Sequence, residues 1–126
     1  MLVVGVDIGG SGVRSAVVHE DVTIGEITRV TLHDLSFKGV IDAVQRAIRP
    51  YEKLDVVGCG VPGFLSDDII VASPNLPVLN GANLSDVLTK TLSVPVHVEN
   101  DANCAVVGGA YVSGITDLVV LTLGTG

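Results

Sequence analysis

The sequence predicts an α/β domain in which a mixed β-sheet carries helices on its faces. Three short β-branched runs lie within the first 32 residues, and after them helical periodicity alternates with apolar, strand-like segments. Three hairpin-linked strands followed by right-handed crossovers give antiparallel strands first and parallel strands later. With 126 residues and 48% hydrophobic content, the chain is large enough for one domain, which we expect over residues 1–126.

The first half predicts a three-stranded meander and one helix. Residues 2–7 and 13–18 form two strand-like runs around a glycine-rich turn, and residues 27–32 extend the meander. Ser36 is placed to cap a helix whose apolar residues recur at helical spacing until Pro50.

The second half predicts alternating strands and helices. Residues 54–60 form a continuous apolar run, as in a strand covered on both faces, and a loop follows over residues 61–65. Residues 69–72 suggest a small extra strand. Pro74 and Pro77 then predict extended chain until Asn83 caps a second helix, which ends before Pro95. A strand at 94–99, a helix at 102–112 and a strand at 117–123 complete the prediction.

Charge and composition exclude several classes of function. Fourteen acidic against seven basic residues give a net charge of −7, so binding to a nucleic-acid backbone is unfavourable. The N-terminal apolar run is interrupted at Asp7, far short of a membrane span, and no basic leader precedes it. Cys59 and Cys104 lack CxxC spacing, which favours reduced core residues in a cytoplasmic setting and no zinc site within this chain.

A GxGxxG pattern at residues 58–63 resembles a dinucleotide fingerprint only superficially. That fingerprint requires a helix directly behind the glycines, whereas residues 64–71 do not have a helical pattern. Pro62 also removes an N–H from the place where a pyrophosphate needs donors. Nicotinamide or flavin binding is therefore disfavoured.

Glycine turns follow strands at both ends of the chain. Asp7 precedes Gly9, Gly10 and Ser11, and residues 121–126 end in Gly-Thr-Gly. A polar residue before a hairpin turn is one ordinary explanation for Asp7. The alternative is a phosphate cleft, because glycine allows a ligand to approach the backbone and a carboxylate can hold the accompanying metal. Arg14, which alternates along the second strand, fits a surface charge equally well.

A polar cluster follows the strand predicted at residues 94–99. Asn100 and Asp101 lie at the junction with the next helix, where either could serve as an N-cap. An aspartate beside an amide at such a strand end could also orient and deprotonate a substrate hydroxyl. His97, which alternates with valines, is interpreted as a structural histidine.

These motifs together resemble the N-terminal half of a ROK-family (repressor, ORF, kinase) sugar kinase, glucokinase-like, with an actin-like, ribonuclease-H-like ATPase fold. The resemblance covers essentially the whole chain. It rests on residues 4–11 as a first phosphate motif, residues 60–63 as a sugar-side loop, residues 73–76 leading to the sugar, residues 98–103 as a catalytic strand end, and residues 121–126 as the start of a second phosphate motif.

The resemblance implies phosphoryl transfer from ATP, with Mg²⁺, to the 6-hydroxyl of a hexose. Asp101 would take the proton of the attacking hydroxyl, and Asp7 would hold the metal through water. The implied sugar-binding residues are Gly63, Phe64, Asn75, Asn100 and Asp101. The implied nucleotide-binding residues are Asp7, Gly9, Gly10, Ser11, Gly124, Thr125 and Gly126.

The sequence also departs from the family pattern. Gly12 replaces the usual lysine or asparagine, a variation that resembles polyphosphate-using glucokinases, so polyphosphate stays open as a donor. Family members are about twice as long, and their zinc motif and adenine pocket lie in the second half. We therefore expect the chain alone to be nearly inactive and to require the C-terminal half of the kinase or a second chain. A homo-oligomer and a sugar-sensing regulator without kinase activity stay open as alternatives.

Overall fold

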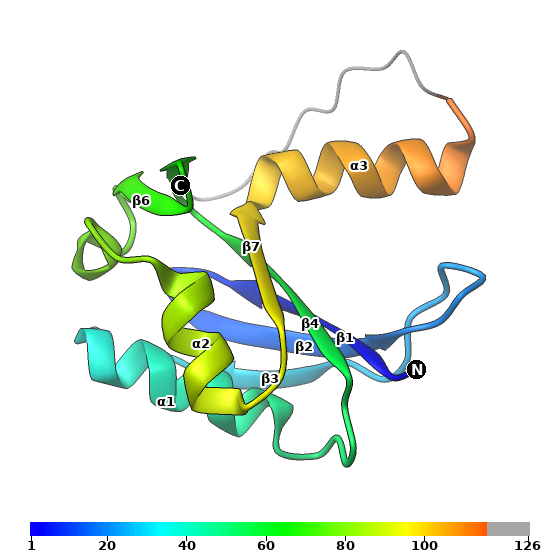
Figure 1. The fold of residues 1–126 in the computed structure, drawn as a ribbon, viewed down its shortest axis with the longest axis horizontal. Helices are drawn as coiled ribbons and strands as arrows, with labels where there is room; N and C mark the ends of the chain where they lie inside the picture. The colour runs from blue at the N-terminus through cyan, green and yellow to red at the C-terminus, as the bar shows by residue number, and fades with distance from the viewer. Residues whose placement is uncertain (116–126) are drawn as a thin grey trace.

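The computed structural model describes residues 1–115, and its centre is a five-stranded sheet in the order β3-β2-β1-β4-β7 (Figure 1). The strand predicted at residues 117–123 lies outside this range. The elements in chain order are β1 (Val3–Ile8), β2 (Gly12–Val18), β3 (Thr28–Thr31), α1 (Phe37–Ile48), β4 (Val56–Val61), β5 (Phe64–Ser66), β6 (Ile69–Ala72), the 3-10 helix η1 (Pro77–Leu79), α2 (Leu84–Leu92), β7 (Val96–Asn100) and α3 (Asp101–Ser113).

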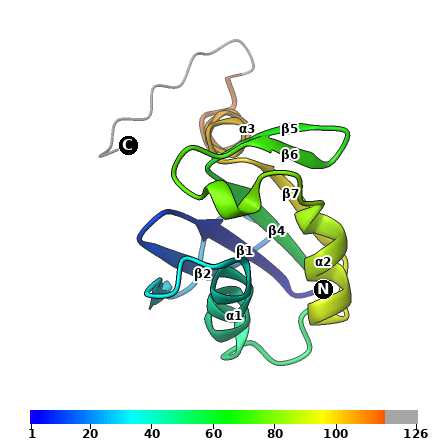
Figure 2. The same ribbon diagram turned by 90° about the vertical axis from the view of Figure 1, so that its left-hand side faces the viewer.

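The predicted mixed sheet is confirmed. β1 pairs with β2 and β2 with β3 in antiparallel fashion, whereas β1, β4 and β7 are parallel. The helices α1 and α2 lie on one face of this sheet, and α3 lies on the other (Figure 2). The fold therefore has three layers, with the two faces of the sheet covered by different helices.

Both predicted helix caps on the α1 and α2 side are confirmed. The Ser36 hydroxyl accepts the N–H of Gly39 at 3.0 Å, and the Asn83 side chain accepts the N–H of Asp86 at 3.0 Å. Each cap satisfies a backbone donor that the first helical turn leaves without a partner.

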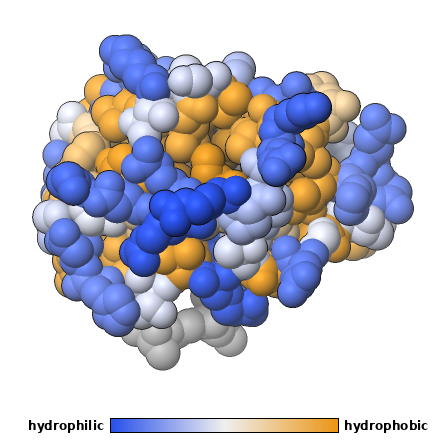
Figure 3. All heavy atoms as spheres, turned by 90° about the horizontal axis from the view of Figure 1, so that it is seen from below, coloured by the Kyte–Doolittle hydropathy of each residue, from blue (hydrophilic) through white to orange (hydrophobic). Residues whose placement is uncertain are grey.

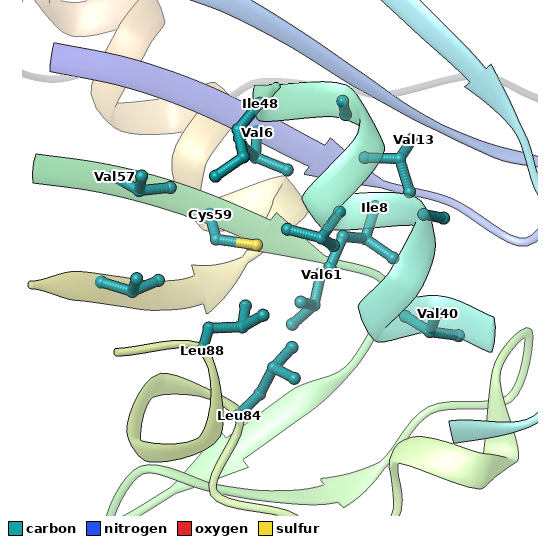
Figure 4. Close-up of a cluster of buried hydrophobic side chains, with 14 of the residues drawn as sticks. Val6, Ile8, Val13, Val40, Ile48, Val57, Cys59, Val61, Leu84 and Leu88 are labelled. Atoms are coloured by element: carbon teal, nitrogen blue, oxygen red, sulfur yellow. The ribbon is translucent and has the colours of Figure 1, made fainter. Parts of the chain in front are cut away.

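The core lies between the sheet and the helices α1 and α2. Alternate residues of β1 point into it, because successive side chains of a strand face opposite sides. Figure 4 shows these side chains meeting those of α1, β4 and α2. The residues labelled there are Val6, Ile8, Val13, Val40, Ile48, Val57, Cys59, Val61, Leu84 and Leu88.

Several local predictions were wrong. The loop expected at 61–65 is shorter, because β4 runs to Val61 and β5 begins at Phe64 and pairs with β6. The stretch expected to be extended contains η1, whose first turn accommodates Pro77 because the fixed φ of proline suits a helix start. Cys59 is buried in the core as predicted, but Cys104 is exposed on α3, and both cysteines are free thiols.

The surface on the α1 side is mixed in character. Seen from below, hydrophilic side chains are scattered among hydrophobic ones rather than gathered in one patch (Figure 3). Among the residues that the structure describes, no helix is long and apolar enough to cross a membrane.

Candidate functional site

The carboxyl ends of the three parallel strands line up at one edge of the sheet. Asp7 in β1 is opposite Gly60 in β4, and Gly60 is opposite Glu99 in β7. Ligands of open α/β sheets bind outside such strand ends. The structure therefore brings the polar ends of β1 and β7 to the same edge of the sheet.

A cavity of about 1130 Å³ lies between this face of the sheet and α3. Part of its floor is glycine: Gly5 and Gly58 are directly opposite each other, and a Cβ added to Gly58 would find no atom within 4 Å. Asp7 and Asp101 both line the cavity. The two carboxylates assigned to metal and base by the resemblance thus face one open space.

Asp101 is the first residue of α3 and is exposed to the cavity. Its Oδ1 accepts the N–H of Ala102 at 2.8 Å. Glu99 lies on the same face, but its Oε1 accepts the N–H of Asn100 at 2.7 Å and the side-chain amide of Asn103 at 3.2 Å. At the start of the helix Glu99 therefore accepts two hydrogen bonds, whereas Asp101 accepts one.

Asn100 connects the strand end to the sugar-side loop. Its Oδ1 accepts the N–H groups of Ala102 and Asn103, at 3.0 and 3.2 Å, which makes it the N-cap of α3. Its Nδ2 donates to the carbonyl of Gly63. A Cβ at Gly63 would lie 3.1 Å from the carbonyl oxygen of Ala72, so the loop is closely packed there. Asn100 therefore positions two segments that the resemblance assigns to the sugar.

Asp7 forms an ion pair with Arg14 on the neighbouring strand. Both Nε and Nη2 of Arg14 donate to Oδ2 of Asp7. The side chains are partly exposed, 58% for Arg14 and 43% for Asp7. Arg14 is exposed, as expected for a surface charge, and it also lines the same cavity as the two carboxylates.

The first glycine turn, between β1 and β2, was expected to be rich in glycine so that a ligand could approach the backbone. The structure gives a different reason, which is close packing within the protein. None of its glycines has a positive φ, so a left-handed backbone does not explain them. A Cβ at Gly12 would lie only 2.8 Å from the carbonyl oxygen of Val30, so a side chain at this position would force the backbone to shift. The N–H of Gly9 donates to the carbonyl of Gly12 at 2.9 Å, so it serves the turn itself.

The other predicted site residues within the described range do not line the cavity. Gly10 packs beside Asn75, since a Cβ on Gly10 would be 3.5 Å from that of Asn75. Ser11 is exposed in the turn, and Phe64 is 66% exposed on β5. Gly124, Thr125 and Gly126 lie outside the described residues.

Carboxylates set the electrostatics of the cavity. Desolvation raises the pKa of the Cys104 thiol above its usual range, and the charges of Glu99, Asp101 and Asp7 raise it further. The Cys104 sulfur lies above Gly60, 3.6 Å from where a Cβ would stand. This end of the cavity is therefore electronegative and would favour a bound cation.

Several residues that line the cavity were not predicted for the site, among them Arg14, Cys104 and His97. His97 is exposed on β7 instead of buried as a structural histidine. A signal for Arg14 existed, because positions 7 and 14 are equally far from the centre of the turn and therefore pair across the hairpin.

The donor set fits Mg²⁺ held by one carboxylate. Mg²⁺ keeps several waters and binds through one or two carboxylates plus substrate phosphates. Asp7 presents a partly exposed carboxylate to the cavity, and residues 1–115 contain no group of three His, Cys, Asp or Glu residues that could form a protein cage.

A sequence profile of the ROK family matches residues 3–126. The chain belongs to the ROK family. It is 36% identical to the glucokinase of Thermotoga maritima, with 98% of this chain covered and 42% of the relative. It is 31% identical to an N-acetyl-D-glucosamine kinase of Haemophilus influenzae, covering 85% of this chain and 37% of that protein.

Solved structures place this ROK chain in the actin-like ATPase fold. A ROK glucokinase from Streptomyces griseus, determined in complex with glucose and AMPPNP, superimposes with a TM-score of 0.79 at 30% identity. The match covers 93% of this chain and 38% of that one. The chain thus spans less than half the length of these relatives, which are sugar kinases.

Proposed function

We propose that this ROK chain supplies the catalytic base and the metal-binding carboxylate of a hexose kinase that uses ATP and Mg²⁺. The observation that carries the proposal is that Asp7 and Asp101 line one cavity at the aligned carboxyl ends of β1 and β7. The kinase names and activities of the relatives support the same reaction class.

In this proposal Asp101 accepts the proton of the sugar 6-hydroxyl as its oxygen attacks the terminal phosphate. Asn100 holds the strand end and the Gly63 loop together, so that the base and the sugar-side segments keep one spacing. The sugar lies against Gly63, Phe64 and Asn75. Mg²⁺, held at Asp7 through water, would neutralise phosphate charge when bound.

The phosphate-side residues complete the proposed site. Gly10 and Ser11 line the turn after β1, where backbone groups and a hydroxyl face solvent. Gly9 contributes shape rather than a donor, because its N–H is used within the turn. Gly124, Thr125 and Gly126 form the second phosphate motif of the proposal. A cytoplasmic setting agrees with the free thiols of Cys59 and Cys104.

We further propose that the domain works with the C-terminal half of the ROK fold. The chain spans 42% of the Thermotoga maritima relative, and no residue of α3 is buried. Val107 is 63% exposed and Tyr111 and Val112 are each 74% exposed, on a helix whose one charged residue is Asp101. An apolar helix of this kind normally packs against a partner surface.

A coupled assay for sugar phosphorylation tests the proposed base. Asp101→Asn in the full-length protein is expected to lower kcat by about 10²- to 10⁴-fold with little change in the KM for sugar. Glu99→Gln is the matched control, since it removes a charge from the same cavity and keeps the acceptor oxygen. Normal turnover by Asp101→Asn would rule out the general-base role.

The same assay on the 126-residue chain tests the need for the second half. We expect turnover near the detection limit, because half a cleft does not exclude water from the reaction. Robust turnover by a monomer would overturn this part of the proposal, and turnover by a dimer would make a second copy the partner. Sugar binding without phosphorylation by the full-length protein would favour the regulator alternative.

A further inference from the structure

A single row of residues crosses the open face of the sheet in continuous register. Glu99 in β7 is opposite Gly60 in β4, Gly60 is opposite Asp7 in β1, Asp7 is opposite Arg14 in β2, and Arg14 is opposite Arg29 in β3. Directly paired residues of neighbouring strands point to the same side of a sheet. The row therefore runs from acidic at one edge to basic at the other.

The two arginines are an unusual pair on this surface. Like charges directly opposite one another across two strands are destabilising, and both side chains are exposed. Arg14 is partly compensated by Asp7, whereas within the described residues Arg29 forms no ion pair. An anion that lies over both side chains would offset this repulsion.

The row also shows which position near the first glycine turn can carry a positively charged side chain. A side chain at position 12 would require the backbone of β3 to shift, because its Cβ would be 2.8 Å from the carbonyl oxygen of Val30. Arg14 is two residues further along the same strand and is the one Lys or Arg residue lining the cavity within the part of the chain that the structure describes. It is thus the cation positioned beside both Asp7 and the cavity.

We propose that Arg14 and Arg29 bind the phosphate chain of the phosphoryl donor, Arg14 nearer the transferred phosphate and Arg29 beyond it. The proposal rests on the kinase function proposed above. Arginine suits this role because its planar guanidinium forms two parallel hydrogen bonds to phosphate oxygens. Neighbouring strands are about 4.8 Å apart, so the row from Glu99 to Arg29 spans roughly 19 Å.

A linear phosphate chain is the ligand that matches such a row. Its repeated negative charges face two successive cations on one side of Asp7, while the acidic end at Glu99 and Asp101 is left for the sugar hydroxyl and its proton. Two donors share this chemistry, the triphosphate of ATP and inorganic polyphosphate. The longer chain would contact Arg29 more strongly.

Titration calorimetry with inorganic tripolyphosphate tests the row without requiring turnover. The full-length protein carrying Asp101→Asn is compared with the same protein bearing Arg14→Ala, Arg14→Lys or Arg46→Ala. Arg46 is the matched control, an exposed arginine on α1 across the sheet. We expect Arg14→Ala to weaken binding at least tenfold, Arg14→Lys to restore part of it, and Arg46→Ala to leave it within twofold.

Donor kinetics in the otherwise unmodified full-length protein separate the two sources. Arg14→Ala is expected to raise the KM for ATP and for polyphosphate at least tenfold with the KM for sugar unchanged. Arg29→Ala should raise the KM for long-chain polyphosphate more than the KM for ATP. Equal increases for both donors would overturn the placement of Arg29 farther along the phosphate chain than Arg14.

The failures are distinguishable. If tripolyphosphate binds Arg14→Ala as tightly as the parent, or if Arg46→Ala weakens binding equally, the row is not the phosphate site, whatever the kinase activity. If no sugar is phosphorylated with either donor but binding still depends on Arg14, the proposed kinase function fails and the anion-binding row stands.

Discussion

On the sheet face covered by α1 and α2, alternate positions of β1 and β4 hold Val, Ile or Cys residues that are nearly inaccessible to solvent. On the opposite face, beneath α3, the intervening positions hold Val3, Gly5 and Asp7 in β1 and Val56, Gly58 and Gly60 in β4. The strands are the same, and only the side chains differ. One face is filled by the chain itself, whereas the other is left open and charged.

This difference separates stability from function within one sheet. The buried face has side chains large enough to interlock with two helices, which is where the free energy of folding comes from. On the open face the glycines have no side chains to pack against a helix, and a cavity of about 1130 Å³ is left there. We interpret it as the face where substrate, donor and the rest of the ROK fold meet this domain.

The largest expected effect is on the free energy of unfolding, when one helix residue is truncated on the buried face of the sheet and one on the open face. Leu88 is fully buried on α2, and Leu88→Ala should lower the free energy of unfolding of the chain by about 2–5 kcal/mol, because a cavity replaces the lost side chain. Val107 is 63% exposed on α3, so Val107→Ala should change it by less than about 0.5 kcal/mol. Urea denaturation followed by circular dichroism measures both.

Equal losses in the two variants would break the comparison. They would mean that α3 packs on its face of the sheet as tightly as α2 does on the other. The 126-residue chain is the right sample for this measurement, since a partner bound over α3 would bury Val107.

The buried face was predictable because it obeys simple periodicity. Alternating and helical apolar patterns located the strands and helices of the described range to within a few residues, and Ser36 and Asn83 identified two helix starts. The strand β6 was predicted at residues 69–72, but its hairpin partner β5 and the turn η1 were missed. Their short lengths give no periodic signal, and prolines suit both extended chain and a helix start.

A smaller effect on stability is expected from substituting two glycines, one closely packed and the other facing open space. Gly12→Ala should destabilise the chain by about 1–3 kcal/mol, because the new methyl group overlaps the carbonyl of Val30. Gly58→Ala should stabilise it by about 0.4–1 kcal/mol, because the methyl enters open space and restricts the unfolded chain. Thermal and urea unfolding of the two variants give the sign of each change.

A destabilised Gly58→Ala would show that the floor of the cavity is packed rather than open. Conversely, a neutral Gly12→Ala would show that β3 moves away easily, and the argument that no cation fits at position 12 would be lost.

The open face was only partly predictable. Asp101 and Asn100 follow from their position at a strand end, but sequence alone did not decide which of them caps α3. The structure assigns the cap to Asn100 and leaves Asp101 in the cavity. The role of Arg14 was left undecided because it depends on the register between β1 and β2, which brings this side chain against Asp7. Register is a property of pairing, which the composition of either strand does not contain.

The smallest expected effect is a change in the reactivity of Cys104, which reports the charge of the open face. Glu99, Asp101 and Asp7 all raise the pKa of this thiol, so less of it is thiolate near neutral pH and alkylation is slower than for an unperturbed cysteine. Glu99→Gln should lower that pKa and speed alkylation by iodoacetamide roughly twofold at pH 8. The effect is small because solvent weakens the interaction between the Glu99 carboxylate and the Cys104 thiolate. Glu20→Gln, on an exposed turn, is the control and should have no effect.

Cys59 is only 2% exposed and should not react in the folded chain, so the signal belongs to Cys104. Added salt should reduce the difference between parent and Glu99→Gln, because it screens exposed charges. If neither Glu99→Gln nor added salt changed the alkylation rate of Cys104, desolvation alone would be keeping the thiol protonated. The open face would then lack the negative potential on which the proposed metal site at Asp7 depends.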